Sequence, residues 1–167
     1  VTATVALETL VARPEENVFA EPGDVLTLVR RPQTFSVFGA TGKNAAITFN
    51  SDKLSLGEAL AQAGGLNDDS ADPGGVFLFR YEPVETVRAL GQPIATNAPQ
   101  GVSPIAYRLD LSDAKSYLLA KRFPVRDKDV IFVADSESRD ASKIATALSN
   151  IVGPVETILI TCANSAC

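Results

Sequence analysis

VFAEPGDVLTL at residues 18–28 returns as FPVRDKDVIFV at residues 123–133, and this repeat decides how the chain is built. Each copy has a turn-forming stretch, then an aspartate (Asp24 or Asp129), then an apolar run of β-prone residues. An alternating apolar segment and a less regular stretch precede each copy. A unit that recurs in this way indicates a chain assembled from copies of one small module.

The composition is that of a globular, acidic protein. The 167 residues are 46% apolar and 21% charged, which suits one or two small domains with their own cores. The net charge is −5 and the 15 Lys and Arg form no basic run, so nucleic acid is not expected as a partner. A chain that starts at Val1 inside an alternating run, with no Met, is expected to be a fragment of a longer precursor.

The sequence offers little chemistry for a reactive site. It has no His, and therefore lacks the commonest general base and neutral metal ligand. The two cysteines, Cys162 and Cys167, cannot complete a four-ligand metal site, so a tail disulfide or two free thiols is expected. No Ser, His and acid set is available for nucleophilic catalysis. We therefore predict no catalytic residue, no metal and no cofactor.

Strands are expected wherever apolar residues alternate or run continuously. They are residues 2–7, 24–30, 34–39, 45–49, 76–81, 105–111 and 129–134. Pro22 and Gly23 predict a turn before the second strand, and residues 41–44 join the next two as a hairpin. In the first hairpin strand, Phe35 and Val37 are predicted to share one face.

The clearest predicted helix begins at Ser55. Ser55 and Glu58 fit a capping box, in which the hydroxyl and the carboxylate each bind a free backbone amide. Gly64 and Gly65 end the helix, because a glycine readily supplies the left-handed turn found at helix ends. Glycines that follow a helix also argue against a phosphate-binding loop, in which they precede one.

The second half of the chain is predicted to add an inserted loop and a short helix. Residues 82–104 form the loop, and within it residues 84–90 fit either a strand or a helical turn. Ser112 is expected to cap a helix that runs to Lys121. Strands, a capped helix and further strands predict an α+β fold, with the helix packed on one face of a mixed sheet.

Several segments in this order resemble the soluble-ligand-binding β-grasp domain, called SLBB. They are EPGDVLTL at 21–28, FSVFG at 35–39, LGEALAQAGGL at 56–66 and VFLFR at 76–80. The later run from Tyr107 to Val133 is similar to the polysaccharide export proteins of Gram-negative outer membranes, the Wza-like family. One departure is Lys128, where the family's second turn usually has Gly, so we expect that turn to be built differently.

The resemblance implies a domain order as well as a fold. Residues 1–30 would be the end of one SLBB copy, and residues 31–135 the next copy with its inserted loop. Residues 136–167 would form an amphipathic C-terminal helix and tail.

The resemblance also implies a non-enzymatic function in the periplasm and outer membrane. Such subunits form a homo-oligomeric ring, stack their β-grasp domains into a hollow cylinder, and let capsular or exopolysaccharide pass outward. They are usually lipoproteins and work with an inner-membrane polysaccharide copolymerase. One alternative is a stand-alone periplasmic β-grasp module that binds a soluble carbohydrate, for which Tyr81, Tyr107 and Tyr117 are the available tyrosines. Another is an electron-transfer or enzyme subunit of β-grasp type, which would need more Cys or a cofactor motif than the sequence contains.

The tail carries an apolar stripe when it is placed on a helical wheel. The stripe consists of Ile144, Leu148, Ile151, Val152, Val155, Ile158 and Leu159. A helix over residues 139–162 would reach about 36 Å, enough to cross a bilayer core, although Gly153 and Pro154 interrupt it. Two interpretations stay open: a membrane-spanning helix, or an amphipathic helix over 140–152 that packs on its own or a neighbour's sheet.

The acidic candidates are interpreted as structural. Asp24 and Asp129 each follow a turn and precede a strand, where an aspartate accepts hydrogen bonds from nearby backbone amides. Asp68, Asp69 and Asp72 match no calcium-loop spacing and are expected to form a solvated acidic loop.

Two short basic pairs, Arg30-Arg31 and Lys121-Arg122, could meet acidic sugars or a neighbouring subunit. Most such pairs are merely solvated.

Overall fold

The computed structural model describes two units separately. The described residues are 10–11, 13, 15, 19–29, 32–49, 53–95, 101–136 and, for the backbone only, 156–159. The two compact units are residues 1–31 and 32–167.

In the first unit, a turn at Pro22 and Gly23 precedes residues 24–29, which are exposed and form no regular strand. The prediction of a strand over 24–30 is therefore wrong for its described residues. A strand needs a neighbour for its N–H and C=O groups, and no described residue supplies one here. The strand expected at 2–7 lies outside the described residues.

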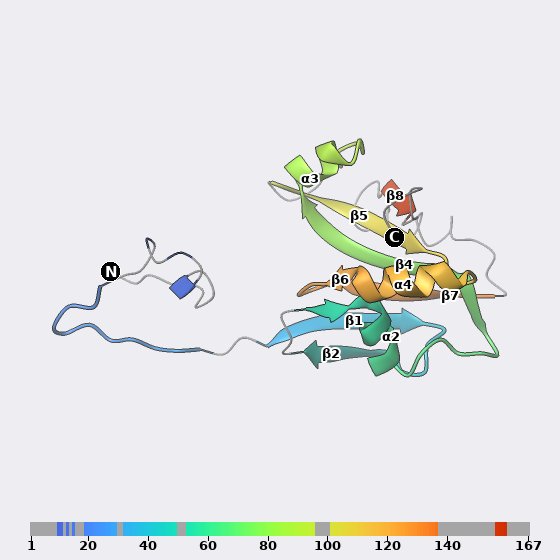
Figure 1. Ribbon diagram of the computed structural model, residues 1–167, viewed down its shortest axis with the longest axis horizontal. Coiled ribbons are helices and arrows are strands. Elements are labelled where there is room, and N and C mark those ends of the chain that lie inside the picture. The colour runs from blue at the N-terminus through green and yellow to red at the C-terminus, as the bar shows by residue number, and fades with distance from the viewer. Residues whose placement is uncertain are drawn as a thin grey trace. The chain divides into compact units, whose positions relative to one another are not determined.

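The second unit is built on a mixed six-stranded sheet with the strand order β2-β1-β7-β4-β5-β8 (Figure 1). These strands are β1 Gln33–Gly39, β2 Ala45–Phe49, β4 Ala71–Pro83, β5 Val102–Leu109, β7 Val130–Asp135 and β8 Glu156–Leu159. A separate two-stranded sheet pairs β3 (Leu54–Ser55) with β6 (Pro124–Val125). The helices are α2 Leu56–Gln62, α3 Val84–Ala89 and α4 Ala114–Arg122.

Two antiparallel hairpins flank a central strand. β1 pairs antiparallel with β2, and β4 pairs antiparallel with β5. Between the hairpins lies β7, which is parallel to β1 and antiparallel to β4. The predicted α+β fold with a mixed sheet is confirmed, and so are the strands predicted within the second unit up to residue 135, each to within a few residues at its ends.

Helix α2 covers one face of this sheet. Its capping box is confirmed: Ser55 N donates to Glu58 Oε2 at 2.9 Å, and Glu58 N donates to Ser55 Oγ at 3.3 Å. At the other end, Gly64 and Gly65 have φ angles of +83° and +78°, in the left-handed region that glycine adopts without strain. Leu60 and Ala61 accept the amides of these glycines through their carbonyl oxygens.

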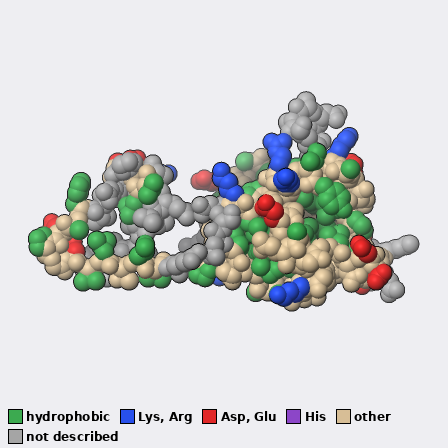
Figure 2. Space-filling view, turned by 60° about the horizontal axis from the view of Figure 1, so that its bottom comes forward, with side chains coloured by type: hydrophobic (Ala, Val, Ile, Leu, Met, Phe, Trp, Pro, Cys, Tyr) green, Lys and Arg blue, Asp and Glu red, His purple; other side chains and the backbone are tan. Residues whose placement is uncertain are grey.

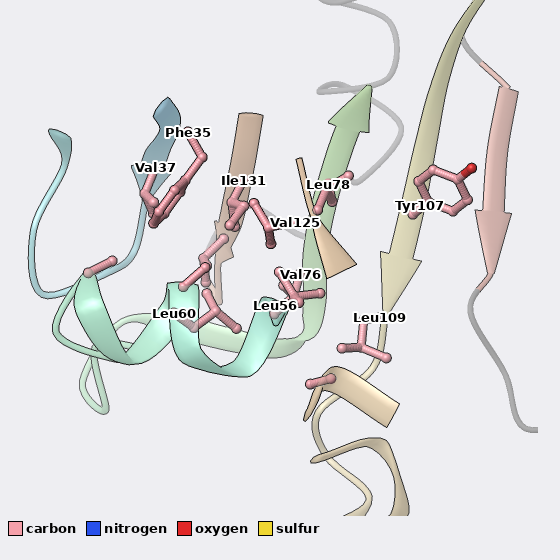
Figure 3. Close-up of a cluster of buried hydrophobic side chains, with 14 of the residues drawn as sticks. Phe35, Val37, Leu56, Leu60, Val76, Leu78, Tyr107, Leu109, Val125 and Ile131 are labelled. Carbon is pink, nitrogen blue, oxygen red and sulfur yellow. The ribbon is translucent and has the colours of Figure 1, made fainter. Parts of the chain in front are cut away.

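The hydrophobic core lies between this helix and the sheet (Figure 3). Its largest fully buried apolar side chains are Phe35, Leu56, Leu78, Ile105, Leu109 and Ile131. The predicted alternation in β1 is confirmed, because Phe35 and Val37 are buried whereas Phe38 is 49% exposed on the other face. Side chains from strands β1 to β7 and from all three helices named above therefore form one continuous core among the described residues.

The region predicted as an inserted loop contains regular structure. β4 continues to Pro83 and leads directly into α3. Residues 84–90, which fitted either a strand or a helical turn, therefore begin with a helix. The second predicted helix starts one residue later than expected. Asp113, not Ser112, is the N-cap and accepts from Lys115 N at 3.2 Å, whereas Ser112 N donates to Asp110 Oδ1 at 2.9 Å in the turn before the helix.

Near the C-terminus, residues 156–159 form strand β8, which is parallel to β5. The prediction of helix is therefore wrong for these four residues, including Ile158 and Leu159. They follow Pro154, which interrupts a helix, and β-branched side chains such as those of Thr157 and Ile158 favour a strand. The other stripe residues, Ile144, Leu148, Ile151, Val152 and Val155, and both cysteines lie outside the described residues.

Within the described part of the chain, no helix combines the length and the apolar character needed to span a bilayer.

Candidate functional site

The two copies of the sequence repeat contain the same hydrogen-bonded turn. In the first unit, Glu21 N donates to Asp24 Oδ2 at 2.8 Å, and Asp24 N donates to Glu21 O at 3.0 Å. In the second unit, Arg126 N donates to Asp129 Oδ2 at 2.7 Å, and Asp129 N donates to Arg126 O at 3.2 Å. Each aspartate thus closes a four-residue turn onto the amide three positions earlier.

The residue before each aspartate is left-handed. Gly23 has φ +104° and Lys128 has φ +70°, so the expectation that Lys128 would change the turn is wrong. A left-handed lysine costs about 1 kcal/mol. Two bonds to β1 offset that cost: Lys128 N donates to Thr34 O at 2.7 Å, and Thr34 N donates to Asp127 Oδ1 at 2.8 Å.

In the second unit the turn is also fixed to the sheet by a buried arginine. Asp129 is 1% exposed, and Arg80 of β4 donates Nε to its Oδ1 at 2.8 Å and Nη2 to its Oδ2 at 2.5 Å. Nη2 of Arg80 also donates to Pro124 O at 2.8 Å. The guanidinium carbon lies 5.9 Å and 5.6 Å from the ring centres of Tyr107 and Phe123. The two parallel hydrogen bonds from Arg80 to Asp129 are bidentate, which is the strongest form of an arginine–carboxylate contact.

Glu82 completes what we call the Arg80 cluster: Arg80, Glu82, Tyr107, Arg126 and Asp129. Glu82 is 2% exposed and accepts from Tyr107 Oη at 2.9 Å, from Arg80 Nη1 at 3.3 Å and from Arg126 Nη1 at 3.0 Å. Two arginines thus face two carboxylates, and the cluster carries no net charge. In the described residues, every buried side-chain nitrogen or oxygen has a hydrogen-bond partner.

Burial and pairing shift the pKa values within the cluster. Burial, together with the hydrogen bond and charge of Glu82, raises the pKa of Tyr107 to about 12. Burial acts to lower the pKa of Arg80, but the hydrogen bonds and charges of Asp129 and Glu82 outweigh it and raise that pKa. Carboxylates held by this many donors are suited to fixing structure, since their lone pairs are already occupied.

Sequence reasoning placed Asp129 in a structural turn but missed the partners that bury it. Arg80 and Glu82 lie two positions apart, after the apolar run from Val76 to Phe79 in β4, and therefore point to the same face. Two opposite charges with that spacing in a buried run are a readable signal of an ion cluster. The local sequence does not show that Asp129, in the turn before β7, would be their partner.

The acidic loop shows no arrangement for a metal. Asp68 and Asp69 are exposed in a turn, as predicted. The prediction of a solvated loop is wrong for Asp72, which lies in β4, is half-buried and accepts from Gly74 N at 2.9 Å. Within the described ranges, no group of three or more His, Cys, Asp or Glu is placed to bind a metal ion.

The exposed side of α4 brings together two candidates that the sequence suggested separately. Tyr117 is 59% exposed, and the Lys121-Arg122 pair lies on the same helix and is exposed too. On the face that Figure 2 shows, several Lys and Arg side chains of this unit lie along the upper edge of the view and one group lies at the lower edge. Tyr107, in contrast, is buried in the Arg80 cluster. The basic pair Arg30-Arg31 lies outside the described residues.

A mixed sheet with a capped helix on one face, closed by an arginine-bound turn, defines this unit as a β-grasp module. The sequence profile of the SLBB domain matches residues 33–133. The chain belongs to the SLBB domain family.

Similarity extends beyond this domain to polysaccharide export proteins. The chain is 40% identical over 158 residues to the capsule polysaccharide export outer membrane protein CtrA of Neisseria meningitidis, covering 93% of this chain and 40% of that protein. It is 35% identical over 155 residues to the capsule polysaccharide export protein BexD of Haemophilus influenzae, covering 91% and 39%. It is 26% identical over 149 residues to the Vi polysaccharide export protein VexA/TviF of Salmonella typhi, covering 89% and 39%.

These matches confirm the resemblance to polysaccharide export proteins of Gram-negative outer membranes. All three relatives are named for export and none for an enzymatic reaction, in agreement with the predicted non-enzymatic class. The chain spans about two fifths of the length of these relatives.

Proposed function

We propose that this chain is part of a periplasmic and outer-membrane subunit that exports capsular or exopolysaccharide from a Gram-negative bacterium. The observation that carries the proposal is similarity along 93% of the chain to a capsule polysaccharide export outer membrane protein. The SLBB match over residues 33–133 supports the same assignment.

In this proposal the subunit acts as one member of a homo-oligomeric ring whose β-grasp domains form the wall of a conduit. Residues 31–135 supply one such domain, and residues 1–30 are the end of a preceding one. The shared turn geometry at Asp24 and Asp129 supports that division. The tail from residue 136 leads toward the outer membrane, and an inner-membrane polysaccharide copolymerase is the expected partner.

A conduit requires a rigid wall more than a reactive centre. The Arg80 cluster supports this role, because a fully hydrogen-bonded buried network holds a turn and a sheet in one arrangement. The cluster joins β4, β5 and the β6–β7 turn, which are distant in sequence.

Imaging of the full-length protein in detergent tests the proposal directly. A closed ring is expected, and deletion of the gene should abolish surface polysaccharide. A monomer that binds one defined oligosaccharide with sub-millimolar affinity would instead establish the alternative, a stand-alone carbohydrate-binding module.

The membrane role of the tail has its own test. Liposome association and solubility are compared for the 167-residue chain and for a version that ends at residue 136. If the deletion changes neither property, the membrane-spanning interpretation is wrong.

A further inference from the structure

Helix α4 buries only one side. Ala120 is 2% exposed and lies against α2, so closely that a Cβ added at Gly57 would come within 3.7 Å of it. The remaining side is exposed and will be called the α4 face. It consists of Lys115, Tyr117, Leu118, Lys121 and Arg122. On a helical wheel these residues cover an arc of about 160°.

The α4 face is positively charged within an acidic chain. Lys115 and Arg122 make no ion pair with any residue that the structure describes. The pKa of Glu58 is lowered mainly by the hydrogen bonds from Ser55 in the capping box, and the positive charge of Lys121 lowers it slightly further. The carboxylate of Asp113 caps the helix. Screening at physiological ionic strength limits charge effects to about 8 Å, so nearby charges count for more than the net charge of −5. The three cations outnumber the two acids beside them, Asp113 and Glu58.

Two large apolar side chains accompany these cations. Tyr117 is 59% exposed and Leu118 is 67% exposed, although burying such side chains is normally favourable. An exposed tyrosine ring offers an apolar face to the C–H groups of a sugar and a hydroxyl to its polar edge. The combination of a ring and cations suits a ligand with apolar faces and negative charges.

We propose that the α4 face binds an acidic polysaccharide, with Tyr117 against a sugar ring and the three cations against carboxylate or phosphate groups along the polymer. The span from Lys115 to Arg122 is about 10 Å along the helix, which suits a short stretch of sugar units. The inference rests on the proposed export function and deepens it by naming the class of polysaccharide.

The test measures binding of oligogalacturonate, a carboxylate-bearing sugar polymer, to the 167-residue chain by calorimetry. Neutral maltooligosaccharide of equal length tests whether sugar rings bind without charge. Polyglutamate of equal charge tests whether charge binds without sugar rings. Oligogalacturonate should bind at least about tenfold more tightly than maltooligosaccharide. The double variant Lys121→Glu/Arg122→Glu should weaken it about tenfold, and Tyr117→Ala by several-fold.

The matched control is Lys43→Glu/Arg88→Glu, which makes the same change in net charge at two exposed positions away from α4. It should leave affinity nearly unchanged, and unchanged thermal unfolding of every variant shows that the fold is intact. The inference is overturned if this control weakens binding as much as the α4 double variant. It is also overturned if Tyr117→Ala changes nothing while polyglutamate binds as tightly as the sugar polymer.

Export in cells separates this inference from the function on which it rests. Full-length protein with Lys121→Glu/Arg122→Glu should export less polysaccharide than wild type. Normal export by that variant, where gene deletion abolishes export, refutes the α4 site and leaves the export function standing. Normal export after gene deletion refutes the export function itself.

Discussion

Replacing Asp129 by asparagine isolates the energetic role of the Arg80 cluster. Asn has nearly the same shape, but it removes the negative charge and turns one acceptor oxygen into a donor that faces Arg80. Removing one partner of a buried ion pair costs about 3 to 5 kcal/mol, because the remaining charge stays buried without compensation. Arg80 keeps Glu82 and the carbonyl of Pro124, so we expect the lower end, about 3 kcal/mol.

Urea unfolding followed by far-UV circular dichroism measures this loss. With a slope of about 1 to 3 kcal/mol per molar urea, the midpoint should fall by about 1 to 3 M. Asp24→Asn is the matched control, since Asp24 closes the same kind of turn but is exposed, whereas Asp129 is buried against Arg80. It should cost less than about 1 kcal/mol. Equal midpoint shifts for the two variants would show that the turn, and not the ion cluster, carries the energy.

Three further substitutions test other parts of the fold. Tyr107→Phe should cost about 1 kcal/mol of unfolding free energy near neutral pH. Because the pKa of Tyr107 is raised to about 12, the stabilisation of the wild type is complete below pH 10 and falls by about 1 to 2 kcal/mol, after screening, as pH rises toward 12. The unfolding midpoints of the two proteins should therefore converge between about pH 10 and pH 12. Lys128→Gly should raise the unfolding temperature, since relief of the left-handed lysine is worth up to about 1 kcal/mol; an unchanged or lower temperature would contradict the assigned strain. Gly39→Ala should prevent stable folding, because Gly39 has φ +93° and a Cβ there would lie 2.0 Å from Val133 O; a soluble variant with native circular dichroism would disprove this.

Features set by neighbouring residues could be predicted from the sequence. The capping box at Ser55 and Glu58 and the alternation through Phe35 and Val37 depend on contacts within a few positions or on one repeating pattern. The helix and the hairpin were therefore predictable. The predicted position of the second helix cap is wrong by one residue, since Ser112 and Asp113 are adjacent and both are favourable N-cap residues.

Features set by distant partners were not predictable in the same way. The contact of Arg80 with Asp129 joins residues 49 positions apart, and it depends on β4 lying beside β7. The strand expected at 24–30 had a suitable pattern, but pattern alone supplies no neighbouring strand. In the tail, helical periodicity was extended through Pro154 into residues that form a strand.

The central place of β7 has a consequence for the order in which this domain assembles. The β1–β2 and β4–β5 hairpins can each form from local sequence, but only the late strand β7 joins them into one sheet. Until residues 130–135 are available, both hairpins present open edges that can pair with other chains. Folding is thus expected to complete in a single late, long-range step, at rates governed by loop closure. The aspartate turn that begins β7 therefore precedes the strand that completes the domain, and chains in which β7 has not yet paired are expected to be the form most prone to aggregation.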